Sequence, residues 1–120
     1  MQITLSNRTN EKAENLKKNF PFLKVISWGK TIKSDLIINA TSLGIKKNDE
    51  IKLDYSKLDG ELFYDVIYNP SKTKFLENAK KFDRKAENGK NMFIYQAQKA
   101  FEIWHGIKPE INEEVYNSIR

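Results

Sequence analysis

The sequence predicts an α/β fold with a mostly parallel sheet flanked by helices. Short apolar runs that are typical of strands alternate with segments whose apolar residues recur at helical spacing. The run at 35–40 has a continuous apolar centre, as expected of a parallel strand that is buried on both faces. The chain has 120 residues, of which 39% are hydrophobic and 31% charged, and this composition is that of a globular protein. We therefore interpret residues 1–120 as a single domain.

Three of the expected strands and one helix fall in the first part of the chain. Pro21 ends the helix between the first two strands, because proline cannot continue a helix. Gly29 closes the second strand, and a turn of small residues at 41–44 follows the third. The expected elements, in order, are a strand at 3–6, a helix that begins at Thr9 or Asn10, and strands at 23–28 and 35–40.

A fourth strand and three helices are expected in the rest of the chain. The lysine-rich segment 46–57 is predicted to be a loop with at most one helical turn. A strand at 62–68 follows, and Asn69 and Pro70 suit the cap and the first position of the next helix. The helices are expected from three sets of apolar residues at helical spacing, namely Phe75, Leu76, Ala79 and Phe82; Met92, Phe93, Ala97, Ala100, Phe101 and Trp104; and Ile111, Val115 and Ile119.

The aromatic residues are the expected core. Trp28, Trp104 and the phenylalanines are interpreted as packing residues, because large apolar side chains at periodic positions usually face the interior. His105, at the end of the helix that contains Trp104, is interpreted as a residue that complements the negative end of the helix dipole.

The composition excludes several kinds of site. The chain has no cysteine and one histidine, so it offers neither a disulfide, a thiolate metal site nor a histidine zinc cluster, and no metal site is predicted. The net charge is +5, but the lysines are spread over every predicted helix without a sustained basic block, so no nucleic-acid partner is expected. No apolar run approaches roughly 18 residues, so no membrane span is expected and the default prediction is a soluble cytoplasmic protein.

A basic cluster follows the first strand. Asn7, Arg8 and Thr9 come at the end of that strand, and Lys12 lies one helical turn later. In a dinucleotide-binding sheet an acidic residue at such a point selects NAD, whereas cationic, hydroxyl and amide donors would hold the 2′-phosphate of NADP. On spacing alone, an ordinary solvated start of a helix explains the same residues, and this alternative stays open.

Polar groups at other expected strand ends and on one helix are further candidates. Thr41 and Ser42 offer hydroxyls in a small turn, which suits close approach of a nucleotide but also occurs in ordinary tight turns. Tyr68 lies at the carboxyl end of the fourth strand, where ligands bind in open α/β sheets, and its role is split between packing and ligand contact. Gln96 interrupts an apolar helical stripe, so either the backbone or a ligand would satisfy its amide.

These motifs occur in order along nearly the whole chain, and together they resemble one family. They are Asn7-Arg8-Thr9; Asn39-Ala40-Thr41-Ser42-Leu43-Gly44; Tyr64-Asp65-Val66-Ile67-Tyr68 with Asn69-Pro70 and Thr73; and Met92 through Gln96-Ala97 with Phe101, Trp104, Gly106 and Pro109. In these motifs the chain is similar to the C-terminal, NADP-binding half of the shikimate dehydrogenases, oxidoreductases of aromatic amino-acid biosynthesis. The resemblance implies NADP as the cofactor and the reduction of 3-dehydroshikimate to shikimate as the reaction of the complete enzyme.

The resemblance also implies roles for individual residues. Helices at 90–120 are expected to close over the site. The implied contacts are Asn7, Arg8, Thr9 and Lys12 with the adenosine 2′-phosphate, Thr41 and Ser42 with the central part of the cofactor, Val66, Gly89 and Met92 near the nicotinamide, and Tyr68 and Gln96 with the bound shikimate.

Two parts of such an enzyme are not found in this sequence. The family's catalytic lysine and aspartate belong to an N-terminal substrate domain, so no catalytic residue is assigned in this chain. The five glycines, at 29, 44, 60, 89 and 106, form no G-x-G phosphate loop. We therefore predict a partial Rossmann-like sheet that lacks the first βα unit. Because the first strand is central in the order 3-2-1-4-5-6, its absence would leave two unpaired edges.

Three functional hypotheses follow. In the first, the chain is a piece of an NADP-dependent shikimate dehydrogenase and is inactive alone. In the second, it is a non-catalytic remnant that binds a nucleotide weakly or self-associates through the unpaired edges, as a homodimer or a swapped assembly. In the third, it belongs to a relative that acts on quinate or an amino-substituted shikimate.

Overall fold

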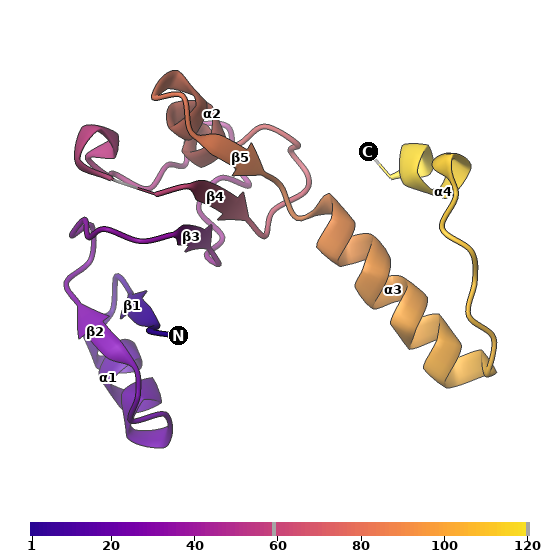
Figure 1. Cartoon of the computed structure of the whole chain (residues 1–120), viewed down its shortest axis with the longest axis horizontal. Helices are drawn as coiled ribbons and strands as arrows, with labels where there is room; N and C mark the ends of the chain where they lie inside the picture. Colours follow the sequence, from indigo (N-terminus) through magenta and orange to yellow (C-terminus); the bar gives the residue numbers. More distant parts are fainter. Residues whose placement is uncertain (59, 120) are drawn as a thin grey trace.

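The computed structural model describes residues 1–58 and 60–119. Its strands form two groups, one early in the chain and one in the middle, and one long helix projects from the second group (Figure 1). The elements, in chain order, are β1 (Thr4–Ser6), α1 (Asn10–Asn19), β2 (Lys24–Ile26), β3 (Leu36–Asn39), the 3₁₀ helix η1 (Tyr55–Lys57), β4 (Leu62–Asp65), α2 (Lys74–Lys81), β5 (Lys85–Glu87), α3 (Lys90–His105) and α4 (Glu113–Ser118). The predicted α/β class is therefore confirmed.

All strand pairs are parallel, and they form two sheets. In the first sheet β1 pairs with β2, and Leu5 lies opposite Val25. In the second sheet β4 lies between β3 and β5, with Phe63 opposite both Ile37 and Ala86. Parallel neighbours need a crossover connection, which α1 supplies between β1 and β2 and α2 supplies between β4 and β5.

Two strand edges are open. Within the described residues β1 and β3 each have a partner on one side only, so the order is β2-β1 and β3-β4-β5. This is a doubly wound order interrupted between β1 and β3, and it confirms the predicted pair of unpaired edges. Leu36 is 48% exposed and Ile38 53% exposed, so the prediction that this strand is buried on both faces is wrong. These two side chains point to a face that the described helices leave uncovered.

The core lies between β4, α2 and η1. Phe63 is fully buried, and its ring centroid lies 5.6 Å from that of Phe75 and 6.0 Å from that of Tyr55. Aromatic rings at such separations attract one another in addition to the apolar area that they bury. The same cluster includes Ile51, Leu58, Leu76 and Ala79. The core therefore fixes β4 and α2, the elements whose ends carry part of the predicted site.

The predicted aromatic core is only partly confirmed. Phe63 and Phe75 are buried, and Trp28 packs against their cluster. Trp104 is 76% exposed and Phe22 is 65% exposed, so their interpretation as core residues is wrong. Trp104 lies in the last turn of α3 and Phe22 in the turn after α1, where periodicity does not distinguish a packed position from an open one. The other exposed phenylalanines are Phe20, Phe82 and Phe101.

Helix α2 begins four residues later than the sequence predicts. A cis peptide bond joins Asn69 to Pro70 in the turn before the helix, and Thr73 is the N-cap residue. The Thr73 hydroxyl accepts a hydrogen bond from the Leu76 backbone N–H at 3.4 Å. The predicted cap at Asn69 is wrong, because the side chains that pack on the core begin only at Phe75. Strand β5 is not expected from the sequence either, since two of its three residues are charged and exposed.

Helix α3 extends away from the sheet of β3, β4 and β5 (Figure 1). Ile94 is its one buried residue, and the helix ends at Gly106, whose φ of 70° is left-handed. His105 lies in the last turn, as predicted. The Gln98 side chain donates a hydrogen bond to the Pro109 carbonyl at 2.7 Å and so ties the chain before α4 back to α3. In the described part of the chain, no helix combines the length and the apolar character that crossing a bilayer requires.

Candidate site at the carboxyl ends of the strands

The predicted site residues follow the carboxyl ends of the parallel strands. Asn7 comes directly after β1, and Thr41 follows the end of β3 by two residues. Val66 comes directly after β4, and Gly89 follows β5 by two residues. Because β3, β4 and β5 run in the same direction, the turns after them meet at one edge of their sheet, which is the usual ligand edge of an open α/β sheet.

Asn7 shapes the turn that contains Arg8. Its side-chain oxygen accepts a hydrogen bond from the Thr9 backbone N–H at 2.9 Å, which is an Asx turn. Thr9 is the N-cap residue of α1, but its hydroxyl makes no capping bond. Arg8, Thr9 and Lys12 are exposed, and neither cation forms an ion pair with another described residue. The turn therefore presents two unpaired cations and a hydroxyl, which are the donors that a phosphate binds.

Asn39 organises the turn after β3. This residue is 2% exposed, and its amide nitrogen donates to the Leu43 carbonyl at 2.9 Å. Its amide oxygen accepts from the Thr41 backbone N–H at 3.0 Å and from the Thr41 hydroxyl at 2.8 Å. The same hydroxyl accepts from the Leu43 N–H at 3.1 Å. Because its proton is donated to Asn39, the Thr41 hydroxyl can only accept from a ligand, whereas the neighbouring Ser42 is exposed.

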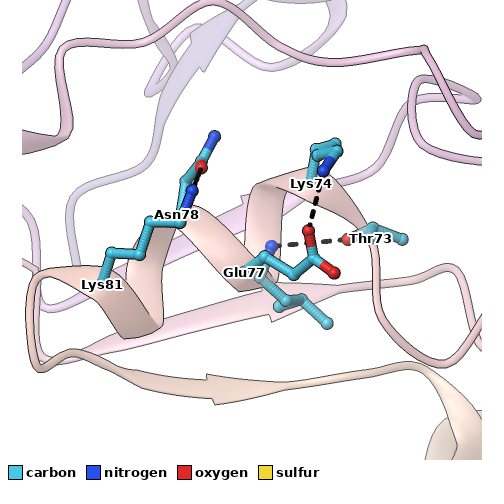
Figure 2. A network of polar contacts seen from close by, with 6 residues as sticks. Thr73, Lys74, Glu77, Asn78 and Lys81 are labelled. Atoms are coloured by element: carbon cyan, nitrogen blue, oxygen red, sulfur yellow. Dashed lines mark hydrogen bonds and ion pairs between the residues drawn. The ribbon is translucent and has the colours of Figure 1, made fainter.

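Asp65 ends β4 as a fully buried carboxylate. Its Oδ1 accepts from the Asn39 side-chain amide at 3.1 Å and from the Ile67 backbone N–H at 3.0 Å. Its Oδ2 accepts from the Thr73 hydroxyl at 2.5 Å. Thr73 stands at the N-terminal end of α2 (Figure 2) and is 2% exposed. Three donors thus satisfy the buried charge, and they join the ends of β3 and β4 to the start of α2.

Val66 and Gly89 are in direct backbone contact. The Gly89 N–H donates to the Ile67 carbonyl at 3.2 Å, and the Gly89 carbonyl accepts from Phe93 at 2.9 Å in the first turn of α3. A Cβ atom on Gly89 would overlap the carbonyl group of Val66. The absence of a side chain at Gly89 therefore lets α3 begin against the turn that follows β4.

Tyr68 packs against the first turn of α3. Its ring stacks on that of Phe93, with centroids 4.5 Å apart and planes 23° apart, and the side chain is half-buried. Met92 is 43% exposed and Gln96 is exposed, so the Gln96 amide is open to solvent and needs no backbone partner. Of the segment 90–120 that is predicted to close over the site, the first turn of α3 lies against Tyr68 and the rest of α3 extends away.

Sequence reasoning gave no role to the three residues that hold these turns together. Asn39, Asp65 and Thr73 lie within the quoted motifs, but they are internal supports and not exposed groups. One signal was present in the sequence: Asn39 and Asp65 each end an apolar strand with a side chain that a buried position accepts only when it is hydrogen-bonded.

Comparison with known proteins identifies the family of this arrangement. Residues 89–113 match the family model described as the shikimate 5′-dehydrogenase C-terminal domain. The NADP-dependent shikimate dehydrogenase of Pelagibacter ubique is 58% identical over 117 residues, which are 97% of this chain and 44% of that protein. The chain therefore spans less than half the length of this curated relative.

Two crystal structures share the fold. A shikimate dehydrogenase in complex with NADP⁺ is 36% identical and superposes with a TM-score of 0.85 over 98% of this chain and 45% of its own. The shikimate dehydrogenase of Thermus thermophilus, in complex with NADP(H) and shikimate, is 27% identical and superposes with a TM-score of 0.84 over 100% of this chain and 47% of its own. Sequence motifs, strand order and these likenesses together match the chain to the C-terminal part of the shikimate dehydrogenases.

Proposed function

We propose that this chain forms the NADP-binding part of a shikimate dehydrogenase, which reduces 3-dehydroshikimate to shikimate with NADPH. The observation that carries the proposal is the pair of exposed cations at the end of β1, Arg8 and Lys12, neither of which pairs with a carboxylate among the described residues. A free ribose hydroxyl, as in NAD, would leave both charges without an anionic partner. A 2′-phosphate would accept bonds from both.

The other turns fit the remaining parts of the dinucleotide. Ser42 is exposed and Thr41 can accept a hydrogen bond, so this turn suits the polar middle of the cofactor. Val66 and Met92 have apolar side chains and Gly89 has none, which suits contact with the nicotinamide. When bound, the cofactor would supply the hydride for reduction of a ketone. Tyr68 and Gln96 have a phenol and an open amide, groups that recognise the hydroxyls of shikimate.

Titration calorimetry of the purified chain with NADP⁺ and with NAD⁺ tests the proposal. We expect the chain to bind NADP⁺ more tightly than NAD⁺ and the variant Arg8→Ala to lose about tenfold or more in affinity for NADP⁺, since bonds to a charged group contribute about 1.5–3 kcal/mol. Lys17→Ala is the matched control, because Lys17 is exposed near the opposite end of α1. Equal affinities for NADP⁺ and NAD⁺, or an Arg8→Ala variant that binds like the wild type, would contradict the proposal.

We propose that the described residues bind the cofactor but do not transfer the proton of the reaction. The unpaired cations of the candidate site, Arg8 and Lys12, lie at the end of β1 and in the first turn of α1, which we call the phosphate turn. The buried carboxylate of Asp65 already accepts from three donors. We therefore expect the isolated chain to show no NADP⁺ reduction with shikimate or with quinate. Turnover of either alcohol by the pure chain would overturn this part of the proposal, and a preference for quinate would favour the quinate-type relative.

The open strand edges support a second proposal, that the isolated chain associates with itself as a homodimer or a swapped assembly. The edges of β1 and β3 lie free within the described residues, and the Leu36 and Ile38 side chains of β3 are exposed. Free edges with apolar side chains are templates for pairing with another chain. Light scattering decides this proposal: a mass of two or more chains supports it, and a monomeric mass at high concentration opposes it.

A further inference from the structure

We infer that Asn39, Asp65 and Thr73 are positioning residues that hold the turns 41–44 and 66–69 in one fixed arrangement for the central part and the nicotinamide of the cofactor. The inference rests on the proposed NADP-binding function. It adds to that function a specific device, in which a hydroxyl at the start of α2 acts through Asp65 and Asn39 on two turns to which it makes no hydrogen bond of its own, although the Thr73 side chain packs beside Gly44.

Few polar side chains are buried in the described residues, and they lie together. Among the described residues, the buried polar and charged side chains are Asn39, Asp65 and Thr73, and hydrogen bonds join all three into one network. A buried charge is costly to desolvate, and apolar residues of similar volume often stabilise a fold equally well. The confinement of these groups to the strand ends that carry the proposed site therefore points to control of geometry.

The hydrogen bonds of the turns give the second argument. The backbone of the turn 41–44 is held by the Asn39 side chain, both directly at Thr41 N–H and Leu43 carbonyl and through the Thr41 hydroxyl at Leu43 N–H. The turn 66–69 is held by the Asp65 side chain at Ile67 N–H. Since Asp65 also accepts from Asn39, a change in the Asp65 orientation displaces both turns.

Thr73 is the point at which the network is anchored. Its hydroxyl donates to Asp65 at 2.5 Å and accepts from the Leu76 N–H, so one side chain caps α2 and orients the carboxylate. Helix α2 is held in turn by Phe75 and Ala79, which are buried in the core. The core therefore fixes Thr73, Thr73 orients Asp65, and Asp65 with Asn39 sets the two turns.

The test compares Thr73→Val, which keeps the shape of the side chain and removes its hydroxyl, with Thr73→Ser, which keeps the hydroxyl. Calorimetry measures the affinity of each variant of the full chain for NADP⁺ and for adenosine 2′,5′-bisphosphate, which carries the 2′-phosphate but no nicotinamide. We expect Thr73→Val to weaken NADP⁺ binding about fivefold or more, as for loss of one hydrogen bond, and to leave binding of the bisphosphate within about twofold. We expect Thr73→Ser to restore NADP⁺ binding.

Hydrogen exchange of backbone amides gives a second readout that needs no nucleotide. We expect Thr73→Val to speed exchange at Leu43 and Ile67, whose N–H groups are bonded to Thr41 and Asp65 and not to Thr73, and Thr73→Ser to restore their protection. Asn112→Ala is the matched control, because Asn112 caps α4 by accepting from Val115 N–H at 2.9 Å and lies outside the network. This control separates the loss of a helix cap from the loss of the network.

The outcomes separate this inference from the proposed function. Equal weakening of both nucleotides, no rescue by Thr73→Ser, or unchanged exchange at Leu43 and Ile67 would overturn the positioning role. If the wild-type chain binds neither nucleotide at millimolar concentration, the proposed function fails, and the exchange comparison still decides whether the network sets the turns. Asp65→Asn makes the same comparison if Thr73→Val does not fold, because it keeps the shape of the carboxylate and replaces one acceptor with a donor.

Discussion

Gly89 is a residue at which one added carbon atom is expected to change the stability of the chain. A Cβ there would overlap the Val66 carbonyl, and backbone on both sides prevents relief by rotation of a side chain. We expect Gly89→Ala to lower the free energy of unfolding by about 1–3 kcal/mol, as for overpacking. Urea denaturation measures the loss. Gly106→Asn is the control, because nothing lies within 4 Å of that position and asparagine tolerates its left-handed φ. An unchanged midpoint for Gly89→Ala would contradict the contact.

The buried phenol of Tyr55 is expected to make the chain less stable at alkaline pH. Burial raises the pKa of its phenol from 10.0 to about 12, and the amide of Asn78 offsets this rise only in part. The folded state therefore holds the phenol proton more tightly than the unfolded state. The contribution of this proton to the free energy of unfolding is fully present below pH 10 and is lost as the pH rises through 12.

Urea titrations between pH 9 and 12 test the role of Tyr55. We expect the urea midpoint to fall over this range in the wild type and to fall less in Tyr55→Phe. The buried Tyr55 hydroxyl has no well-formed hydrogen bond to another described residue, so its removal at neutral pH is expected to be neutral or stabilising. Tyr95→Phe is the control, because Tyr95 is 61% exposed. An equal alkaline fall in Tyr55→Phe and wild type would contradict the assignment.

Exposed candidates for the site are easier to propose from the sequence than the buried residues that support their turns. Arg8 and Ser42 were recognised because a charge or hydroxyl in a turn has an evident chemical use. Asp65 was not, because a carboxylate after an apolar run can equally be a solvated turn residue. Its role depends on Asn39, 26 positions earlier, and only the parallel pairing of β3 with β4 brings the two side chains together.

At the scale of elements, the outer edge and open face of β3 are expected to govern association. We expect Ile38→Lys to reduce the mass of the chain in light scattering, because a charge on an edge strand opposes pairing with a second copy. Ile45→Lys is the matched control, since Ile45 is 55% exposed but lies in the loop after β3. An Ile38→Lys chain that associates as strongly as wild type would show that the β3 edge is not the interface.

Helices and strands were predictable where burial follows a regular pattern. The amphipathic residues of α2 gave its body correctly, but its start depends on the bond between Thr73 and Asp65, which no local pattern shows. β5 was not predictable because its pairing with β4 comes from the sheet and not from its own residues, of which two are charged. The predicted apolar stripe of α3 lies on a helix, yet Met92, Phe101 and Trp104 are exposed, and the buried residue of the helix is Ile94.

At the scale of the whole molecule, the residues of the proposed cofactor site are divided between two sheets. The core around Phe63 fixes β4 and α2, and the polar network transmits this position to the turns at the carboxyl ends of β3 and β4. The phosphate turn stands apart, on the sheet of β1 and β2. The two halves of the proposed NADP site therefore belong to different sheets, and one NADP molecule would contact both of them.

A map of the backbone amide NMR shifts on addition of NADP⁺ tests directly whether the cofactor contacts both sheets. On addition of NADP⁺ we expect shifts in both sheets, in the segment from Asn7 to Lys12 and at Ser42, Val66 and Gly89. On addition of adenosine 2′,5′-bisphosphate we expect shifts in the segment from Asn7 to Lys12 alone. If NADP⁺ shifts residues of both sheets and the bisphosphate shifts only those near Arg8, the two sheets bind different parts of one dinucleotide. Shifts confined to residues away from these turns, or no shifts at millimolar NADP⁺, would contradict the proposed NADP site.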